Sequence, residues 1–101
     1  MQRLPPLNAL QTFEAVARLC SITRASEELH VTQSAVSQQI KLLEDHLVLA
    51  LFIRRPGGLE LTESAIQLLP EVSQAFRIIQ NAVDEIDLEQ KSILINTCLL
   101  Y

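Results

Sequence analysis

A chain of 101 residues is long enough for one domain, or for one domain with an appendage. The hydrophobic fraction of 49% supplies a core, and the aromatic fraction of 4% without tryptophan favours a small helical domain. The formal net charge is −4, whereas nucleic-acid-binding domains are often basic. No apolar run approaches the roughly 18 residues of a membrane span, and nothing resembles a signal peptide.

The first two predicted helices are separated by a short polar interruption. Residues 7–20 have apolar side chains at steps of three, four and three, which is typical of one buried helical face. These side chains are Leu10, Phe13, Ala17 and Cys20. Ser21 or Thr23 can cap a second helix that ends near His30 and turns Arg24 outward.

The third predicted helix, residues 32–47, has two different faces. Its apolar residues recur at steps of four, three and four and predict a buried face. They are Val36, Ile40, Leu43 and Leu47. Solvated helix faces usually carry Glu and Lys, whereas the outward residues here are mostly amides and hydroxyls that donate and accept hydrogen bonds. They are Gln33, Ser34, Ser37, Gln38 and Lys41.

The start of the third helix suits an anion or a base edge. Thr32 is the expected N-cap, so the following turn carries unpaired N–H groups and the positive end of the helix dipole. A tight turn at residues 30–32 joins two helices, and the second has a polar outer face. This is the helix-turn-helix arrangement, and we interpret residues 32–47 as a DNA recognition helix.

Two strand-like pieces follow the recognition helix. Residues 52–54 and 59–61 flank Arg55-Pro56-Gly57-Gly58, whose glycines can turn the chain. The pattern predicts a two-stranded wing in which Arg54 and Arg55 reach phosphates or the minor groove. The alternative is a solvated hairpin whose arginines serve solubility.

The charges are unevenly distributed along the chain. Residues 1–62 contain six basic and six acidic side chains, whereas residues 63–101 contain two basic and six acidic ones. The acidity therefore belongs to the C-terminal part. A neutral module can bind DNA if its cations cluster on one side, but its sequence-independent attraction is weak, so two copies on one site would be needed.

A long helix is predicted from Thr62, as its cap, to about Leu88. Apolar residues recur in steps of four and three for about three heptads, and a domain of about 60 residues cannot cover so long a seam. We expect a partner chain to cover it; the alternative is a last core helix that folds back on its own domain. Pro70 should kink this helix or mark a late start. The seam is Ala65, Leu69, Val72, Phe76, Ile79, Val83 and Ile86.

Residues 89–91 are a polar hinge, and the apolar residues 92–101 are predicted to form a buried strand. A single strand needs a partner, and none follows in the sequence.

No catalytic or metal-binding pattern is present. Glu44, Asp45 and His46 are adjacent and therefore fan around a helix instead of converging. There is no glycine-rich phosphate loop, no metal-ligand spacing and no nucleophile motif. Cys20 and Cys98 are far apart, and Cys20 is predicted to be a buried, reduced thiol. The sequence thus predicts a cytoplasmic protein that is not an enzyme and uses no cofactor and no metal.

Several motifs together resemble the N-terminal domain of LysR-type transcriptional regulators. They are Leu10-Gln-Thr-Phe13, Ser21-Ile-Thr-Arg-Ala-Ser-Glu-Glu-Leu29, Val31-Thr-Gln-Ser-Ala-Val-Ser-Gln-Gln-Ile40, Leu43-Glu44, Leu51-Phe52 with Arg54, and Leu61-Thr62. The opening Leu4-Pro-Pro-Leu-Asn-Ala-Leu10 is similar to the group that regulates glycine cleavage and β-lactamase expression. The resemblance covers residues 4 to about 88.

The resemblance implies a winged helix-turn-helix whose linker helix forms dimers, which pair into tetramers, followed by a domain that senses a small molecule. It places base and phosphate contacts on Gln33, Ser34, Ser37 and Gln38. It also implies that Thr23 and Arg24 hold phosphate and that Arg54 acts from the wing.

Three positions depart from the family pattern. Gln38 stands where the family commonly has Arg, which exchanges a cation suited to guanine for an amide suited to adenine. Val48 stands where the family usually has Gly at the end of the recognition helix, so this helix end should be strained or reshaped. Ala65 replaces another usual Gly and should favour helix.

These observations predict a mostly α-helical chain in three parts. Residues 1–62 form a winged helix-turn-helix of three helices and a two-stranded wing, residues 63–89 a dimerisation helix, and residues 90–101 the remnant of a first sensor-domain strand. We expect a truncated regulator without an effector site that binds double-stranded DNA as a homodimer, a tetramer or a mixed dimer with a full-length paralogue. The alternative is a helical protein-interaction module with little DNA binding. The predicted DNA-contacting residues are Thr23, Arg24, Thr32, Gln33, Ser34, Ser37, Gln38, Lys41, Arg54 and Arg55. The predicted dimerisation residues are Leu69, Val72, Phe76, Ile79, Val83 and Ile86.

Overall fold

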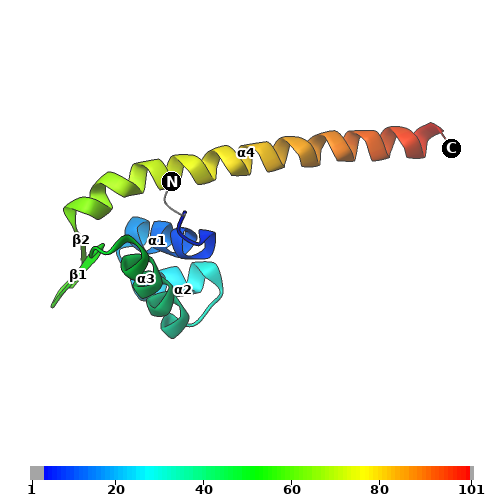
Figure 1. The fold of residues 1–101 in the computed structure, drawn as a ribbon. Helices are drawn as coiled ribbons and strands as arrows, with labels where there is room; N and C mark the ends of the chain where they lie inside the picture. The colour runs from blue at the N-terminus through cyan, green and yellow to red at the C-terminus, as the bar shows by residue number, and fades with distance from the viewer. Residues whose placement is uncertain (1–3, 101) are drawn as a thin grey trace.

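The computed structural model describes the backbone of residues 4–100 and the side chains of residues 4–87. Three helices precede a small sheet, and a fourth, long helix follows it (Figure 1). The elements are α1 (Leu7–Leu19), α2 (Ile22–Leu29), α3 (Gln33–Leu47), β1 (Phe52–Arg55), β2 (Gly58–Leu61) and α4 (Glu63–Leu100). This order confirms the predicted mostly α winged helix-turn-helix with a long C-terminal helix.

Side-chain caps fix the starts of the second and third helices as expected. The Ser21 hydroxyl accepts a hydrogen bond from the Arg24 N–H at 3.1 Å, so Ser21, not Thr23, is the N-cap of α2. The Thr32 hydroxyl accepts from the Ala35 N–H at 3.0 Å at the start of α3. Each cap satisfies one N–H that has no acceptor inside its helix, which sets where the helix begins.

Helices α1, α2 and α3 all end in a residue with left-handed backbone geometry that is not glycine. Cys20, His30 and Val48 have φ of 51°, 58° and 56°. This conformation crowds the Cβ atom, most of all in a β-branched residue. The sequence predicts that Val48 either strains or reshapes this helix end. The left-handed geometry is kept, and the N–H groups of Val48 and Leu49 both donate to the Glu44 carbonyl. The helix end is therefore strained and not reshaped.

The core lies where α1, α2 and α3 meet the wing and the start of α4. The largest fully buried side chains are Phe13, Leu43, Leu51, Val16 and Val36. The Phe13 and Phe52 rings lie 5.7 Å apart and join α1 to β1. The predicted buried face of the recognition helix is confirmed, because Val36, Ile40 and Leu43 are buried and Leu47 packs against them.

The prediction of a buried thiol at Cys20 is wrong. Cys20 lies just after α1 in the left-handed residue that ends the helix, and it is exposed. Its Sγ donates to the Ala17 carbonyl at 3.5 Å. The spacing of three, four and three residues predicts side chains on one helical face, and this is valid up to Ala17. The chain leaves the helical path at Cys20, so the Cys20 side chain no longer points toward the core.

The wing is an antiparallel pair with Phe52 opposite Leu61 and Arg55 opposite Gly58. Gly58 has φ of 136°, a conformation that L side chains rarely adopt, so a glycine is required at this turn. Phe52, Leu59 and Leu61 are half-buried against the core, whereas Arg54, Arg55 and Glu60 are exposed.

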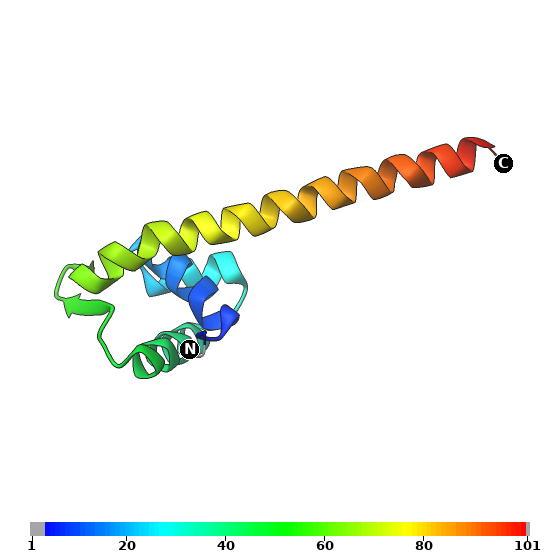
Figure 2. The same cartoon turned by 45° about the horizontal axis from the view of Figure 1, so that its top comes forward.

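Helix α4 starts where Thr62 was expected to cap it, and the Ala65 N–H donates to the Thr62 hydroxyl at 3.3 Å. Pro70 lies inside the helix, so a late start is excluded. Figures 1 and 2 show α4 crossing over α1 and then extending well beyond the other helices. The molecule is accordingly elongated, with principal extents of 63 × 34 × 19 Å.

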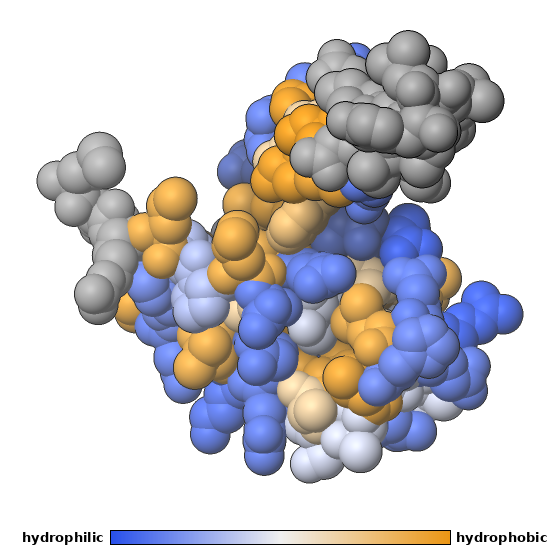
Figure 3. Space-filling view, turned by 90° about the vertical axis from the view of Figure 1, so that its right-hand side faces the viewer, coloured by the Kyte–Doolittle hydropathy of each residue, from blue (hydrophilic) through white to orange (hydrophobic). Residues whose placement is uncertain are grey.

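The predicted apolar seam of α4 is divided between two environments. Ala65 and Val72 are buried, and Leu69 and Phe76 are half-buried against the core of the same chain. Ile79, Val83 and Ile86 are about half exposed, at 51%, 46% and 55%. The first half of the seam therefore matches the alternative of a helix that folds back on its own domain, and the second half remains uncovered (Figure 3).

The predicted strand over residues 92–101 is wrong, because α4 continues as a helix to Leu100. The backbone groups of a single strand without a partner stay unpaired, whereas a helix pairs them within the segment. Continuation of an existing helix also needs no new nucleation. Cys98 lies outside the residues whose side chains are described.

Candidate nucleic-acid interface

The outward face of α3 carries two parallel rows of polar side chains. Residues four apart lie one above the other on a helix, so Gln33, Ser37 and Lys41 form one row. Ser34 and Gln38 form the second row. Ser37 is half-buried, and the other four are exposed. The rows present amide and hydroxyl groups that can read the donor and acceptor pattern of base edges.

The amino end of α3 adds backbone donors to this face. The Thr32 hydroxyl is engaged with the Ala35 N–H, and the Thr32 carbonyl accepts from Val36. The N–H groups of Gln33 and Ser34 are in the first turn and have no acceptor within the helix. They point out of the amino end together with the positive end of the helix dipole, which favours an anion.

The first turn of α2 places Thr23 and Arg24 on the surface. Both side chains are exposed, and the Arg24 backbone is fixed by the Ser21 cap. The Arg24 guanidinium has no ion-pair partner among the described side chains, so its charge is available to a phosphate.

A cleft of about 320 Å³ separates α3 from the wing. Ser37 and Lys41 border it from α3, and Arg54 borders it from β1. Its remaining lining comes from Val16, Ile22, Ile40, Glu44, Phe52 and Leu59. A second cleft of about 280 Å³ brings Arg54 and Arg55 next to Ser21 and Ile22 at the start of α2. The structure thus brings the wing arginines close to both helices of the helix-turn-helix.

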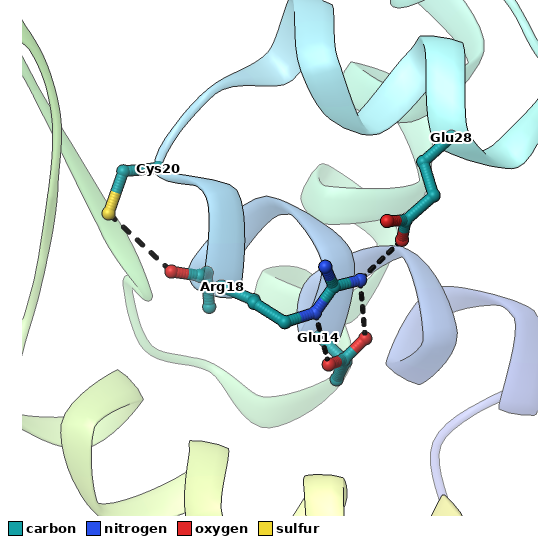
Figure 4. A network of polar contacts seen from close by, with 5 residues as sticks. Glu14, Arg18, Cys20 and Glu28 are labelled. Carbon is teal, nitrogen blue, oxygen red and sulfur yellow. Dashed lines mark hydrogen bonds and ion pairs between the residues drawn. The ribbon is translucent and has the colours of Figure 1, made fainter.

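Some of the basic side chains are neutralised by ion pairs within the domain. Arg18 is held by Glu14 at 2.9 Å and by Glu28 on the next helix (Figure 4). The Glu28 contact, followed by that of Glu14, raises the pKa of Arg18 above its ordinary value, and the Arg18 contact lowers the pKa of Glu28. Arg18 is therefore neutralised on the side of α1 and α2.

Three of the predicted DNA-contacting cations have no carboxylate partner among the described side chains: Arg24, Lys41 and Arg54. Arg55 is paired with Glu60 at 2.7 Å. The unpaired cations belong to α2, α3 and the wing, the three elements that carry the predicted contacts. Lys41 and Arg54 border the cleft between α3 and the wing together with one carboxylate, that of Glu44, so the charged side chains around it have a net positive charge.

Sequence reasoning missed the role of Glu44. Its Oε2 accepts from the Leu51 N–H at 2.7 Å and from the Phe52 N–H at 3.4 Å, so it ties α3 to the wing. The available signal is its position, because Glu44 follows Leu43 at the edge of the buried face in the last turn of α3, within reach of the following loop. A carboxylate at such an edge can accept loop N–H groups.

Among the described residues, no three His, Cys, Asp or Glu side chains form a group that could hold a metal ion. In the same part of the chain, none of the helices combines the length and the apolar character needed to cross a membrane.

The fold and the exposed polar helix define a winged helix-turn-helix protein. The family model described as "Bacterial regulatory helix-turn-helix protein, lysR family" matches residues 7–66, and the chain belongs to this family.

Relatives in the family are named as regulators of transcription. The chain is 54% identical over 82 residues to "HTH-type transcriptional activator AmpR" of Providencia stuartii, covering 81% of this chain and 28% of that one. It is 56% identical over 75 residues to "Glycine cleavage system transcriptional activator" of Escherichia coli K12, covering 74% and 25%. The chain thus spans about a quarter of the length of these relatives.

A solved structure named "Crystal structure of CbnR_DBD-DNA complex" superposes with a TM-score of 0.71 at 28% identity. The match covers 79% of this chain and 92% of that one. The match therefore covers most of this chain and nearly all of that DNA-binding domain.

Proposed function

We propose that this chain is a sequence-specific, double-stranded DNA-binding module of a LysR-type transcriptional regulator. The observation that carries the proposal is the shared cleft at which Ser37 and Lys41 of α3 lie opposite Arg54 of the wing. Recognition groups and unpaired cations thereby face the same side of the molecule. The similarity to a domain solved in complex with DNA supports the same assignment.

Each predicted residue has a role that follows from its position. Gln33, Ser34, Ser37 and Gln38 read base edges in the major groove, since amides and hydroxyls can pair with them. Thr23, Arg24, Thr32 and Lys41 contact phosphates on either side of the groove. Arg54 and Arg55 reach the adjacent backbone or minor groove from the wing.

The chain acts in our proposal as a homodimer through the uncovered half of α4. Ile79, Val83 and Ile86 recur at steps of four and three and are about half exposed, so they form a seam that a second helix can cover. Two copies would double the phosphate contacts of a module that is neutral overall, which compensates for its weak electrostatic attraction.

The test is a mobility-shift titration of the whole chain on duplexes from its own upstream region, repeated at several salt concentrations. DNA binding should give a slope of log affinity against log salt equal to several phosphate contacts. Gln33→Ala and Ser37→Ala should reduce the preference between DNA sequences more than they reduce binding itself. Base contacts distinguish sequences, whereas phosphate contacts supply most of the sequence-independent affinity.

A helical protein-interaction module is the second candidate, and the exposed apolar stripe of α4 favours it. In that case the chain would form dimers or mixed dimers with little affinity for any duplex. A chain that associates through α4 but shows no salt-dependent binding would decide for this second function.

A further inference from the structure

The loop between α3 and the wing is held from both sides. From α3, Glu44 Oε2 accepts from the Leu51 N–H at 2.7 Å. From the start of α4, the Thr62 N–H donates to the Leu51 carbonyl at 3.0 Å, and the Thr62 hydroxyl donates to the Ala50 carbonyl at 2.8 Å. The Leu51 side chain between them is fully buried, with 0% exposure.

Both polar groups of the Leu51 backbone are therefore bound to different helices. Its N–H is tied to α3 through Glu44, and its carbonyl is tied to the start of α4 through Thr62. Because the Leu51 side chain is packed in the core, this peptide cannot shift without disturbing that packing. One residue thus links the recognition helix, the wing and the helix proposed to join two copies.

Hydrogen bonds give this link a direction that apolar packing lacks. Hydrophobic contact is non-directional, so packing alone sets the orientation of the wing less sharply than a bond aimed at one N–H group does. A carboxylate that accepts backbone N–H groups forms a short, charge-assisted bond with a preferred geometry. The backbone carbonyl of residue 44 accepts from the Val48 and Leu49 N–H groups whatever its side chain, so the Glu44 carboxylate contributes specifically the bonds to Leu51 and Phe52.

We propose that Glu44 and Thr62 are positioning residues for DNA recognition. Glu44 sets where Arg54 stands relative to the polar rows of α3, and Thr62 sets the direction in which α4 leaves the winged domain. This inference rests on the DNA-binding function proposed above. Neither residue touches the duplex; both act through the backbone of residues 50–52.

A double-mutant cycle on the whole chain tests the Glu44 half. Arg54→Ala should weaken binding about tenfold at about 0.1 M salt and lower the salt slope by about one. In a Glu44→Ala background the same change should cost less than about twofold, because the wing no longer holds Arg54 against the duplex. Glu44→Gln keeps an acceptor oxygen and should restore most of the Arg54 effect. Equal Arg54 effects in both backgrounds would overturn the Glu44 role.

Thr62→Val and Thr62→Ser test the other half as a matched pair, since only serine keeps the hydroxyl. The readout is the affinity for a two-half-site duplex divided by the affinity for one half-site. Valine should lower this ratio about tenfold and serine should restore it, because the second copy reaches its half-site only if α4 leaves at the right angle. Circular dichroism establishes that each variant is folded; if Glu44→Ala is not, the Thr62 pair decides. An unchanged ratio in folded Thr62→Val would overturn the proposal.

Amide hydrogen exchange separates this inference from the proposed function, because it needs no DNA. Glu44→Ala should speed exchange at the Leu51 and Phe52 N–H groups while the α1 core stays protected. If exchange at Leu51 is unchanged, the positioning bond does not exist. If exchange changes but the wild-type chain ignores every duplex, the bond stands and the DNA-binding function fails.

Discussion

Arg55 at the tip of the wing is held by Glu60, with the guanidinium Nε 2.7 Å from a carboxylate oxygen. The two residues lie diagonally across the hairpin, since Arg55 is opposite Gly58 and Glu60 is opposite Ile53. Both side chains are more than half exposed, at 61% and 57%, so the pair contributes little to stability. Its main effect is to neutralise one of the two wing arginines.

Replacement of Glu60 by Gln should therefore strengthen DNA binding. The change frees Arg55 for a phosphate, so affinity should rise about threefold to tenfold and the salt slope should steepen by about one. Salt-titrated mobility shifts measure both quantities. Glu71→Gln is the control, because it removes the same charge from α4, away from the wing. If both variants gain equally, the pairing of Arg55 with Glu60 does not limit binding.

Gln38→Arg should change which base is preferred as well as how tightly the chain binds. Gln38 is exposed on the outer face of α3, so a longer side chain fits there without disturbing the core. An amide pairs well with adenine and a guanidinium with guanine, with a discrimination of about 1–3 kcal/mol. Binding to duplexes with single base changes measures the preference. Gln38→Met should lose the preference with an unchanged salt slope, and an arginine variant that keeps the wild-type preference would place Gln38 away from the bases.

Val48→Gly should stabilise the protein. Val48 has φ of 56° and is 88% exposed, so its side chain gains little from packing while its Cβ is crowded. Relief of this strain outweighs the extra chain entropy of glycine, and we expect a gain of about 1 kcal/mol. Urea unfolding measures it. Val31→Gly is the control, since Val31 has no positive φ and should lose stability. A loss at Val48 as well would mean that the left-handed end is not strained.

Most of the winged helix-turn-helix could be predicted because its signals are local. The apolar steps of α3 and the capping residues Ser21 and Thr32 each act within a few residues, and each was confirmed. The wing followed from the glycine pair and the strand-like pieces on either side of it. Such patterns depend on backbone geometry that the sequence carries directly.

The predictions that failed concern residues whose structure is set by tertiary contacts or by the path of the chain. Cys20 was predicted to be buried because it fits the apolar spacing of the first helix, but α1 ends at Leu19 and Cys20 follows it. The seam of α4 is uniform in sequence, yet contact with α1 covers Val72 and leaves Val83 exposed. Residues 92–100 are apolar enough for a strand, but they continue an existing helix. The bond between Glu44 and Leu51 joins a helix to a loop and has no periodic signal.

The ion pair of Arg18 with Glu28 predicts a modest pH dependence. The contact lowers the pKa of Glu28 in the folded state, so the stabilisation is present above the unfolded pKa and is lost as the pH falls through the folded one. Arg18 and Glu28 are 45% and 43% exposed, so solvent screening holds the effect to under about 1 kcal/mol. Arg18→Gln should cost this amount at pH 7 and progressively less as the pH falls below the ordinary pKa of a glutamate, as measured by urea unfolding.

The matched control for this pH dependence is Arg77→Gln on α4, because Arg77 has no ion-pair partner among the described side chains. It should leave stability unchanged over the same pH range. A cost for Arg18→Gln that grows on acidification would contradict the assigned pairing.

Val83→Glu should separate the proposed dimer without unfolding the winged domain. Val83 lies in the exposed half of the seam between Ile79 and Ile86, beyond the part of α4 that packs on the core. Burying a carboxylate between two helices is strongly unfavourable, so the variant should sediment as a monomer at concentrations where the wild type is dimeric. Asn81→Glu places the same charge near the opposite face of α4 and should leave the dimer intact. Because a monomer keeps one recognition helix, Val83→Glu should retain single half-site binding and lose the extra affinity for two half-sites. A dimer that survives Val83→Glu would place the contact between copies on another surface of the molecule.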